Sequence, residues 1–324
     1  MASTTLGDTG MTVSRICLGC MSFGTGKYEW SLPEDESREI IERAVDLGIT
    51  FFDTSNNYSW GESERILGNA LSGYDRDAQV VATKVHRQMD DDNPNSGGLS
   101  RKTIEQELEH SLDRLGMATV DLYQIHRWGE DTPIEVTLGA LDDAVRRNQV
   151  RYIGASSMWA HQFADALSTS DRLGLERFAT MQNHYSLAYR EEEREMLPLC
   201  EREGIGVIPW SPLAKGFLTR PHDEQYTTAR GEVDDLLHER PYDADPNVEV
   251  NERVQELAED AGASMAQIAI AWVLHQDAVD APIVGTTSVE HLEEAVEAVE
   301  IALSDSDLEY LEEPYEPLPV IGHS

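Results

Sequence analysis

Short apolar runs alternate with amphipathic stretches along nearly the whole chain. Runs of about four to eight residues rich in Ile, Val, Phe and Tyr are typical of buried strands, whereas apolar positions three and four residues apart are typical of helices. In residues 37–48, for example, Ile40, Ile41 and Ala44 lie on one helical face and Gly48 ends the helix. The predicted strands are 15–19, 49–53, 79–84, 121–126, 150–156, 178–182, 204–210 and 282–285, and the predicted helices are 37–48, 62–73, 101–116, 134–149, 159–167, 190–204 and 289–300.

This alternation favours an α/β fold in which eight strands close into a (β/α)8 TIM barrel, with residues 1–324 as a single barrel domain. Residues 4–13 predict an N-terminal β-hairpin, and residues 213–251, rich in charge, Gly, Pro and Thr, predict a long surface loop after the seventh strand. An open doubly wound sheet is the competing fold. It would normally carry G-x-G-x-x-G after its first strand, and the corresponding stretch LGCMSFGTG lacks that spacing.

The composition is strongly acidic, with 61 acidic and 25 basic residues and a net charge of −36. Such a charge argues against nucleic acid and anionic membranes as partners. The acidic residues are dispersed along the chain, and only four lysines occur. A surface of this kind suggests a halophilic protein, because salt in the cytoplasm screens the self-repulsion. An ordinary acidic protein is the alternative.

Cys17, Cys20 and Cys200 are an odd number, and no second cysteine pair or histidine cluster completes a zinc site beside Cys17-x-x-Cys20. We therefore expect core cysteines and no metal. The first ten residues contain no apolar targeting segment, and no run of 18 apolar residues follows. These features predict a soluble, cytoplasmic protein of a reducing compartment whose partner is a small-molecule substrate. The oligomeric state stays open.

Four polar side chains follow three successive predicted strands: Asp53, Tyr58, Lys84 and His126. The carboxyl ends of barrel strands are where active sites lie. A lysine ammonium lowers the pKa of a phenol, a carboxylate keeps that lysine charged, and a neutral imidazole adds a hydrogen bond to a substrate oxygen. Singly, each residue has an ordinary structural role, but together they predict a site that protonates a carbonyl oxygen. The hydride must then come from a nicotinamide cofactor.

Several ordered segments resemble the aldo-keto reductase family: FFDTSNNY-x-x-GESERILGNAL, VVATKV, DLYQIH, VRYIGASSM, MQNHYSL, GVIPWSPLAKGFLT and PIVGTTSVEHLEEAVEA. The resemblance covers nearly the whole chain and looks closest to the prokaryotic branch related to potassium channel β subunits. It implies an NADP(H)-dependent oxidoreductase that reduces aldehydes and ketones to alcohols. It also implies a catalytic tetrad of Asp53, Tyr58 as general acid, Lys84 and His126.

The same resemblance implies a set of cofactor-binding residues. They are Ser156, Ser157 and Gln182 for the nicotinamide carboxamide, Trp210 for stacking on the ring, Ser211, Leu213 and Gly216 for the pyrophosphate, Arg230 as a phosphate-binding arginine in the loop after the seventh strand, and Gly285, Thr287, His291 and Glu294 for the adenosine phosphate. The chain departs from the commonest family patterns at Ser157, His291 and Ala295. NAD(H) therefore stays open beside NADP(H).

Met21, Trp30, Trp60 and Trp128 lie on predicted loops at the catalytic face, where they would form a broad apolar substrate pocket or simply cover the barrel mouth. Two other functions stay open. The protein could be a cofactor-bound regulatory or sensor subunit with little turnover. It could also be a lyase that uses Lys84 as a Schiff base, although Asp53 would keep that amine protonated.

Overall fold

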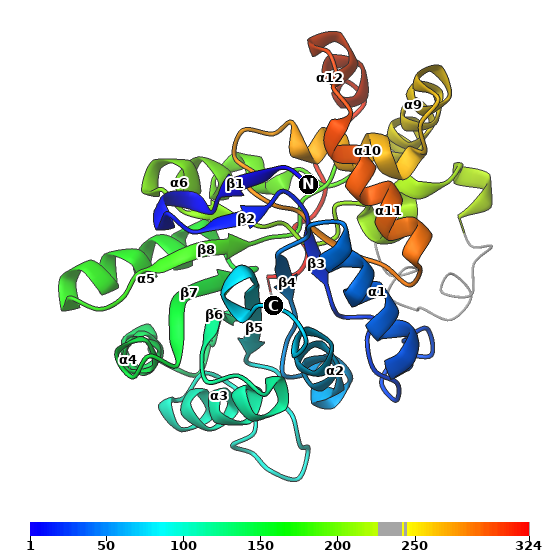
Figure 1. The fold of residues 1–324 in the computed structure, drawn as a ribbon. Coiled ribbons are helices and arrows are strands. Elements are labelled where there is room, and N and C mark those ends of the chain that lie inside the picture. The colour runs from blue at the N-terminus through cyan, green and yellow to red at the C-terminus, as the bar shows by residue number, and fades with distance from the viewer. Residues whose placement is uncertain (226–241, 243–244, 324) are drawn as a thin grey trace.

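An eight-stranded parallel sheet forms the centre of the protein (Figure 1). The computed structural model describes residues 1–225, 242 and 245–323. The strands of the sheet follow the order β10-β3-β4-β5-β6-β7-β8-β9. They are β3 (Cys17–Gly19), β4 (Phe51–Asp53), β5 (Val80–Val85), β6 (Val120–Ile125), β7 (Val150–Ser156), β8 (Phe178–Gln182), β9 (Gly206–Val207) and β10 (Ile283–Gly285).

β9 and β10 are at opposite ends of this order, but the segment directly after β9 contacts β10. Trp210 forms a parallel bridge with Ile283, and the backbone N–H of Ile283 donates to the carbonyl of Pro209 at 2.8 Å. These bonds join the segment after β9 to β10, so the sheet curls round on itself. The predicted (β/α)8 barrel is confirmed.

Helices surround the strands on the outside (Figure 1). In the described part of the chain none of them is long and apolar enough to cross a membrane. The helices are α1 (Glu34–Asp46), α2 (Glu62–Leu71), α3 (Arg101–Leu115), α4 (Ile134–Arg146), α5 (Ala160–Leu173), α6 (Met196–Glu203), α9 (Asp245–Ala261), α10 (Met265–Leu274), α11 (Val289–Glu297) and α12 (Asp305–Glu312).

Two expectations about the C-terminal third were wrong. Residues 289–300 are not the last helix, because α12 follows, and residues 298–300 form a 3-10 turn instead of continuing α11. The stretch 213–251 is not one irregular loop: it begins with the short 3-10 segments η5 (Ala214–Thr219) and η6 (His222–Glu224), and α9 begins within it. Residues 226–241 and 243–244 of that stretch lie outside the described residues.

The predicted N-terminal hairpin is present and lies against the amino ends of the strands. Its strands β1 (Ser3–Thr5) and β2 (Thr12–Ser14) are antiparallel. Gly7, between them, has a left-handed φ of +48°, and a Cβ there would meet the backbone nitrogen of Gly206 at 2.4 Å. Only glycine allows so close a backbone approach. The hairpin thus places Leu6 in the apolar cluster that fills this end of the barrel.

The barrel interior changes from apolar to polar along the strands. Phe51, Ala82 and Leu122 belong to the apolar cluster near the amino ends. Successive strand residues face opposite sides, so the residues two positions further on face inward as well. Asp53 and Lys84 occupy two of these positions, and the parallel register pairs Lys84 with a third polar residue, Gln124. Alternation alone therefore gathers buried polar side chains at the carboxyl ends of β4, β5 and β6.

Candidate active site

Lys84 is the centre of the buried polar cluster. Its side chain is 0% exposed, and that of Asp53 is 2% exposed. The Lys84 ammonium donates to Asp53 Oδ2 at 2.5 Å, to the carbonyl of Thr54 at 2.9 Å and to the Tyr58 hydroxyl at 3.1 Å. Tyr58 reaches this point because it opens a tight 3-10 turn, η2 (Tyr58–Gly61), shortly after β4. Three of the predicted tetrad residues are therefore in direct contact.

The charge states of these groups follow from burial and from their neighbours. Burial disfavours the Lys84 ammonium, but Asp53 and Tyr58 outweigh it and the pKa of Lys84 is raised. For Tyr58 burial is the largest influence and raises the pKa, while Lys84 acts in the opposite direction. Lys84 thus acts on the phenol in the expected direction, but burial outweighs it and the net pKa of Tyr58 is raised. A half-buried phenol with a raised pKa keeps its proton at neutral pH.

His126, directly after β6, is the fourth member of the cluster. Its ring meets the ring of Tyr58 edge to face, with centroids 5.8 Å apart, and its Nδ1 lies 3.2 Å from Ser55 Oγ. Burial, followed by the positive charges of Lys84, Arg127 and other nearby groups, holds the pKa of His126 well below its usual value. His126 is thus a neutral ring, as the sequence predicts, and its Nε2 remains for another partner.

Two glutamines complete the surroundings of Asp53. Gln124 Nε2 and Gln182 Nε2 donate to Asp53 Oδ1 at 2.9 Å and 3.0 Å. Gln124 and Ser55 are site residues that the sequence reasoning did not single out. The available signal was a polar residue inside a buried apolar run, as Gln124 is within DLYQIH. Asp53 is consequently fixed by an ammonium on one oxygen and by two amides on the other.

The residues predicted for the nicotinamide form a second group beside this cluster. Ser156 Oγ donates to the backbone carbonyl of Gln182 at 2.9 Å, and Trp210 Nε1 donates to Ser157 Oγ at 2.9 Å. The Trp210 indole is stacked on the ring of His184, with centroids 4.3 Å apart and planes 12° apart. The structure therefore brings these four predicted residues together and fixes the plane of the indole.

The residues predicted for the rest of the cofactor are more dispersed. Ser211 has a φ of +53°, and Ala214, Lys215 and Gly216 have φ values of +48°, +57° and +97°, so the backbone here follows a left-handed path. Leu213 immediately precedes η5. Arg230 lies outside the described residues.

The predicted adenosine-phosphate residues lie at the end of β10 and on α11. Gly285 ends β10, and Thr287 and His291 are exposed. The backbone N–H of His291 donates to Ser288 Oγ at the start of α11. Glu294 accepts a 3.2 Å hydrogen bond from Ser264, just before α10.

The predicted substrate-pocket residues lie on the loops after β3, β4 and β6. Trp30 is stacked on Tyr28 at 4.9 Å, and Trp60 is 49% exposed. Trp128 is half-buried and packs against the core, and Met21 is half-buried. Their contribution to a substrate pocket stays a prediction.

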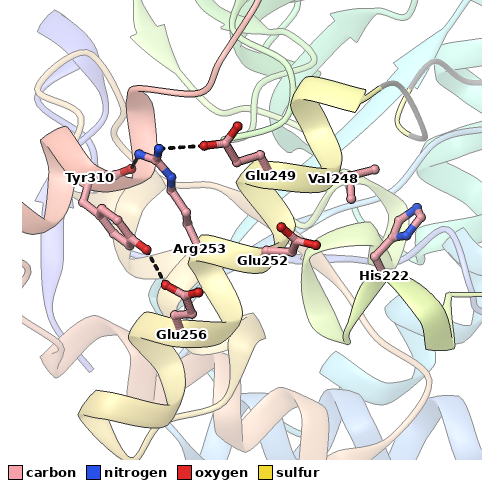
Figure 2. A pocket seen from close by; sticks show the side chains of 7 residues that line it. All are labelled: His222, Val248, Glu249, Glu252, Arg253, Glu256 and Tyr310. Carbon is pink, nitrogen blue, oxygen red and sulfur yellow. Dashed lines mark hydrogen bonds and ion pairs between the residues drawn. The ribbon is translucent and has the colours of Figure 1, made fainter.

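A hollow of about 680 Å³ lies elsewhere, where α9 meets α12 and η6 (Figure 2). Arg253 of α9 donates to Glu249 of the same helix at 2.7 Å and to the carbonyl of Tyr310 on α12 at 2.6 Å, and the second bond ties the two helices together. Nowhere among the described residues do three His, Cys, Asp or Glu side chains gather in a way that could hold a metal ion. The hollow is lined by His222, Val248, Glu249, Glu252, Arg253, Glu256 and Tyr310.

Comparison with known proteins identifies the family. The model of the Aldo/keto reductase family matches residues 15–316. A Schizosaccharomyces pombe protein provisionally named as an aryl-alcohol dehydrogenase is 41% identical over 98% of this chain and 96% of its own. The Metarhizium robertsii aldo-keto reductase dtxS3 is 42% identical over 98% of this chain and 92% of its own. The versiconal hemiacetal acetate reductase of Aspergillus parasiticus is 40% identical over 96% of each chain.

These relatives are fungal, and they lend no support to the expected prokaryotic branch beside potassium channel β subunits or to a halophilic source. The family match and the coverage of nearly the whole chain nevertheless agree with the barrel and with the buried cluster at its carboxyl end. The chain therefore belongs to the Aldo/keto reductase family of oxidoreductases.

Proposed function

We propose that the protein reduces aldehydes and ketones to alcohols, with Tyr58 as the general acid and NADP(H) as the cofactor. The observation that carries this proposal is the contact of one buried ammonium, Lys84, with both the Asp53 carboxylate and the Tyr58 phenol. Two relatives named as an aryl-alcohol dehydrogenase and as a reductase support the same reaction class. The substrate class is a small aromatic or aliphatic carbonyl compound.

Tyr58 holds the proton that the reaction needs. Because Lys84 donates to the phenolic oxygen, the phenol's own hydrogen is left for the oxygen of a substrate. As that hydrogen is transferred, negative charge develops on the phenol, and the adjacent ammonium stabilises it. Asp53 keeps Lys84 charged throughout. The three side chains thus act as one acid whose conjugate base is stabilised in advance.

His126 is the second group that would hold the substrate oxygen. We infer that in the reactive tautomer Ser55 donates its hydroxyl hydrogen to Nδ1 at 3.2 Å, instead of to Asn57 Oδ1 at 3.0 Å, which leaves the hydrogen of the neutral ring on Nε2. Nε2 can then donate to the oxygen that Tyr58 protonates. A protonated His126 would compete with Tyr58 as the acid, and its lowered pKa prevents this at neutral pH.

A nicotinamide cofactor, when bound, would supply the hydride that no side chain can supply. The residues present fit such a group. His184 covers one face of the Trp210 indole, so a nicotinamide ring would stack on the other face. Ser156, Ser157 and Gln182, all buried, would hold its carboxamide, and the left-handed backbone of residues 214–216 offers a curved path for a pyrophosphate.

The alternative chemistry at Lys84, a Schiff-base lyase, needs a neutral amine. Lys84 is instead held by Asp53 at 2.5 Å, and its pKa is raised. The ammonium form is therefore stabilised, and an ammonium has no lone pair with which to attack a carbonyl carbon. The reductase is the better proposal.

The high negative charge supports a further proposal, that the chain works in a salt-rich cytoplasm. Its three cysteines are free and buried, which is compatible with a reducing compartment.

The experiment that tests the proposed function is multiple turnover by the purified protein. With NADPH or NADH in excess, 4-nitrobenzaldehyde should be converted to its alcohol for many cycles per protein molecule. Oxidation of a single equivalent of bound cofactor, with no further turnover, would overturn the proposal in favour of a cofactor-bound sensor. A borohydride-trapped adduct on Lys84 would overturn it in favour of a lyase.

A further inference from the structure

Lys27, in the loop after β3, lies beside the catalytic cluster, among the loops that follow the carboxyl ends of the strands; these loops are called the entrance to the site. Its ammonium donates at 2.7 Å to the backbone carbonyl of Asn57, the residue before Tyr58. It also lies 4.6 Å from the ring centre of Trp60, a cation–π contact. Trp60 is held there with a left-handed φ of +56°, a strained backbone for a large side chain, and such strain is concentrated at functional sites.

Two arginines enter the same region from neighbouring strands. The register pairs Val85 with Ile125, and the N–H of His126 continues the ladder by donating to the carbonyl of Val85 at 2.9 Å. Arg87 lies two residues after Val85, and Arg127 lies two residues after Ile125. They therefore leave adjacent strands at the same level, on the catalytic face of the barrel.

The positive charges of this cluster act on one another and on the site. Burial lowers the pKa of Lys27, and Arg87 lowers it further. Arg127 and Arg87 also contribute, after burial and Lys84, to the low pKa of His126. Lys27, Arg87 and Arg127 consequently form a cationic cluster around the entrance to the catalytic site.

This cluster is unusual in a chain of net charge −36. Most other arginines in the described part of the chain are paired with carboxylates, as Arg65 is with Glu34 and Glu62. Arg15 and Arg220 differ, because Arg15 donates to backbone carbonyls and Arg220 to a threonine hydroxyl. Neither Lys27 nor Arg87 has a described carboxylate oxygen within the 4.0 Å of an ion pair, although residues 90–92 on the same loop as Arg87 are all aspartates. Both cations therefore remain available to an anion from outside the chain.

We propose that the substrate of this enzyme carries an anionic group, such as a carboxylate, that Arg87 and Lys27 bind while its carbonyl lies between Tyr58 and His126. This rests on the proposed carbonyl reduction. A guanidinium binds a carboxylate through two parallel, charge-assisted hydrogen bonds. Screening limits the repulsion from distant acidic residues to a Debye length of about 8–10 Å, so the local cations dominate at the entrance.

The position of the cluster separates it from the predicted cofactor site. Its residues lie on the loops after β3, β5 and β6, whereas the side chains predicted for the nicotinamide lie on and after β7, β8 and β9. An anion held at the entrance is therefore distinct from the predicted nicotinamide site. Trp60, on its turn beside Lys27, would cover the aromatic or aliphatic body of the substrate between the two ends.

The test compares 3- and 4-formylbenzoate with the corresponding formylbenzamides, which have nearly the same shape without the charge. The wild type and the Arg87→Gln and Lys27→Gln variants are assayed with the cofactor that supports turnover. Arg202→Gln is the matched control, because it makes the same change of charge near the end of α6, next to the amino end of β9 and away from the site. Binding of each benzoate is also measured directly by calorimetry.

The proposal predicts that wild type prefers at least one benzoate to its amide in kcat/KM. Arg87→Gln should lower that preference at least about tenfold, as expected when the charge-assisted hydrogen bonds of the guanidinium are lost. The loss should appear mainly in KM, because the anion is bound equally in the ground state and in the transition state. Lys27→Gln should lower it less, and Arg202→Gln should leave it unchanged.

A wild type that prefers the amides, or an Arg87→Gln variant that loses benzoate and amide turnover equally, would overturn the proposal. If neither class of aldehyde is reduced, the proposed carbonyl reduction fails instead. Calorimetry still decides on the anion site in that case: weaker benzoate binding in Arg87→Gln than in Arg202→Gln supports it, and equal binding rejects it.

Discussion

The ammonium of Lys84 donates a 3.1 Å hydrogen bond to the hydroxyl oxygen of Tyr58. The direction of this bond decides what the phenol can do. Its oxygen already accepts a hydrogen, so its own hydrogen is available for a second partner on the side of His126. The phenol is therefore arranged as a donor that becomes a stabilised anion, which is the geometry of a general acid.

Replacement of the phenol should remove the acid and leave the rest of the site in place. Tyr58→Phe should lower kcat by roughly 10²–10⁴-fold, the usual loss for a missing general acid. Cofactor binding, measured by the quenching of tryptophan fluorescence, should be unchanged, because Trp210 and Gln182 are untouched. Near-normal turnover in this variant would rule out Tyr58 as the proton donor.

The pH profile of carbonyl reduction should have no limb near neutral pH. The pKa of Tyr58 is raised above its ordinary value of roughly 10, so the phenol keeps its proton up to that pH and the rate should fall only beyond it. The pKa of His126 is well below its usual value, so His126 stays neutral and adds no limb between about pH 6 and 7. The measurement is kcat/KM for one uncharged aldehyde from about pH 6 to beyond about pH 10. A limb near pH 6.5 that disappears in His126→Gln would show that His126 titrates in the working enzyme.

Removal of Lys84 should destabilise the fold as well as the reaction. Lys84→Met leaves the buried Asp53 carboxylate without its ammonium, and breaking a buried pair in this way costs about 3–5 kcal/mol of unfolding free energy. The amides of Gln124 and Gln182 still satisfy one oxygen, which favours the lower end of that range.

Urea unfolding of Lys84→Met and of the double variant Asp53→Asn/Lys84→Met checks this account. The double variant has no buried charge to leave unpaired, so it should be more stable than Lys84→Met alone. If it is less stable, the hydrogen bonds that the Asp53 carboxylate accepts from Gln124 and Gln182 outweigh the cost of its unpaired charge.

The acidic surface leads to a prediction about salt. With 61 acidic and 25 basic residues the surface repels itself, and counterions reduce that repulsion. The Tm should therefore rise steeply between dilute buffer and molar KCl. A Tm that stays constant over this range would leave an acidic protein with no adaptation to salt.

The barrel could be predicted from sequence because its strands are short apolar runs that end in polar residues, as in FFD and VVATK. α10 was harder to predict, because its sequence MAQIAIAWVL is apolar on nearly all sides and most of it is buried, which removes the amphipathic period. α12 is short and polar, and Arg253 of α9 helps to hold it by donating to the Tyr310 carbonyl. A tertiary contact of this kind leaves no local pattern.

The prediction of the site was likewise limited to what local sequence patterns reveal. Asp53, Tyr58, Lys84 and His126 could be predicted to converge because they follow neighbouring strands. The direction of the Tyr58 pKa shift could not be predicted from the sequence, since it depends on how deeply the phenol is buried. Arg87 attracts attention only once the structure pairs it with no carboxylate among the described residues.

Two carboxylates, Glu293 and Glu294, lie on α11 beside the predicted adenosine site. A carboxylate that faces the ribose would select NADH over NADPH. Glu293, however, is paired with Arg43 at 2.5 Å, and Glu294 accepts a hydrogen bond from Ser264. Both carboxylates have partners on neighbouring helices or loops. Their opposition to a cofactor phosphate is reduced accordingly, which favours NADPH.

A chain of charge −36 still repels the 2′-phosphate of NADPH, so a local cation must outweigh that field. Arg230 is the candidate, because a guanidinium binds phosphate oxygens through paired, charge-assisted hydrogen bonds. We predict that wild type has the higher kcat/KM with NADPH and that Arg230→Ala lowers the NADPH-to-NADH ratio about tenfold. Arg202→Ala, the same substitution near the opposite end of the barrel, should leave the ratio unchanged. If wild type prefers NADH, or if Arg230→Ala and Arg202→Ala behave alike, Arg230 does not bind the phosphate and the choice of cofactor rests on other residues.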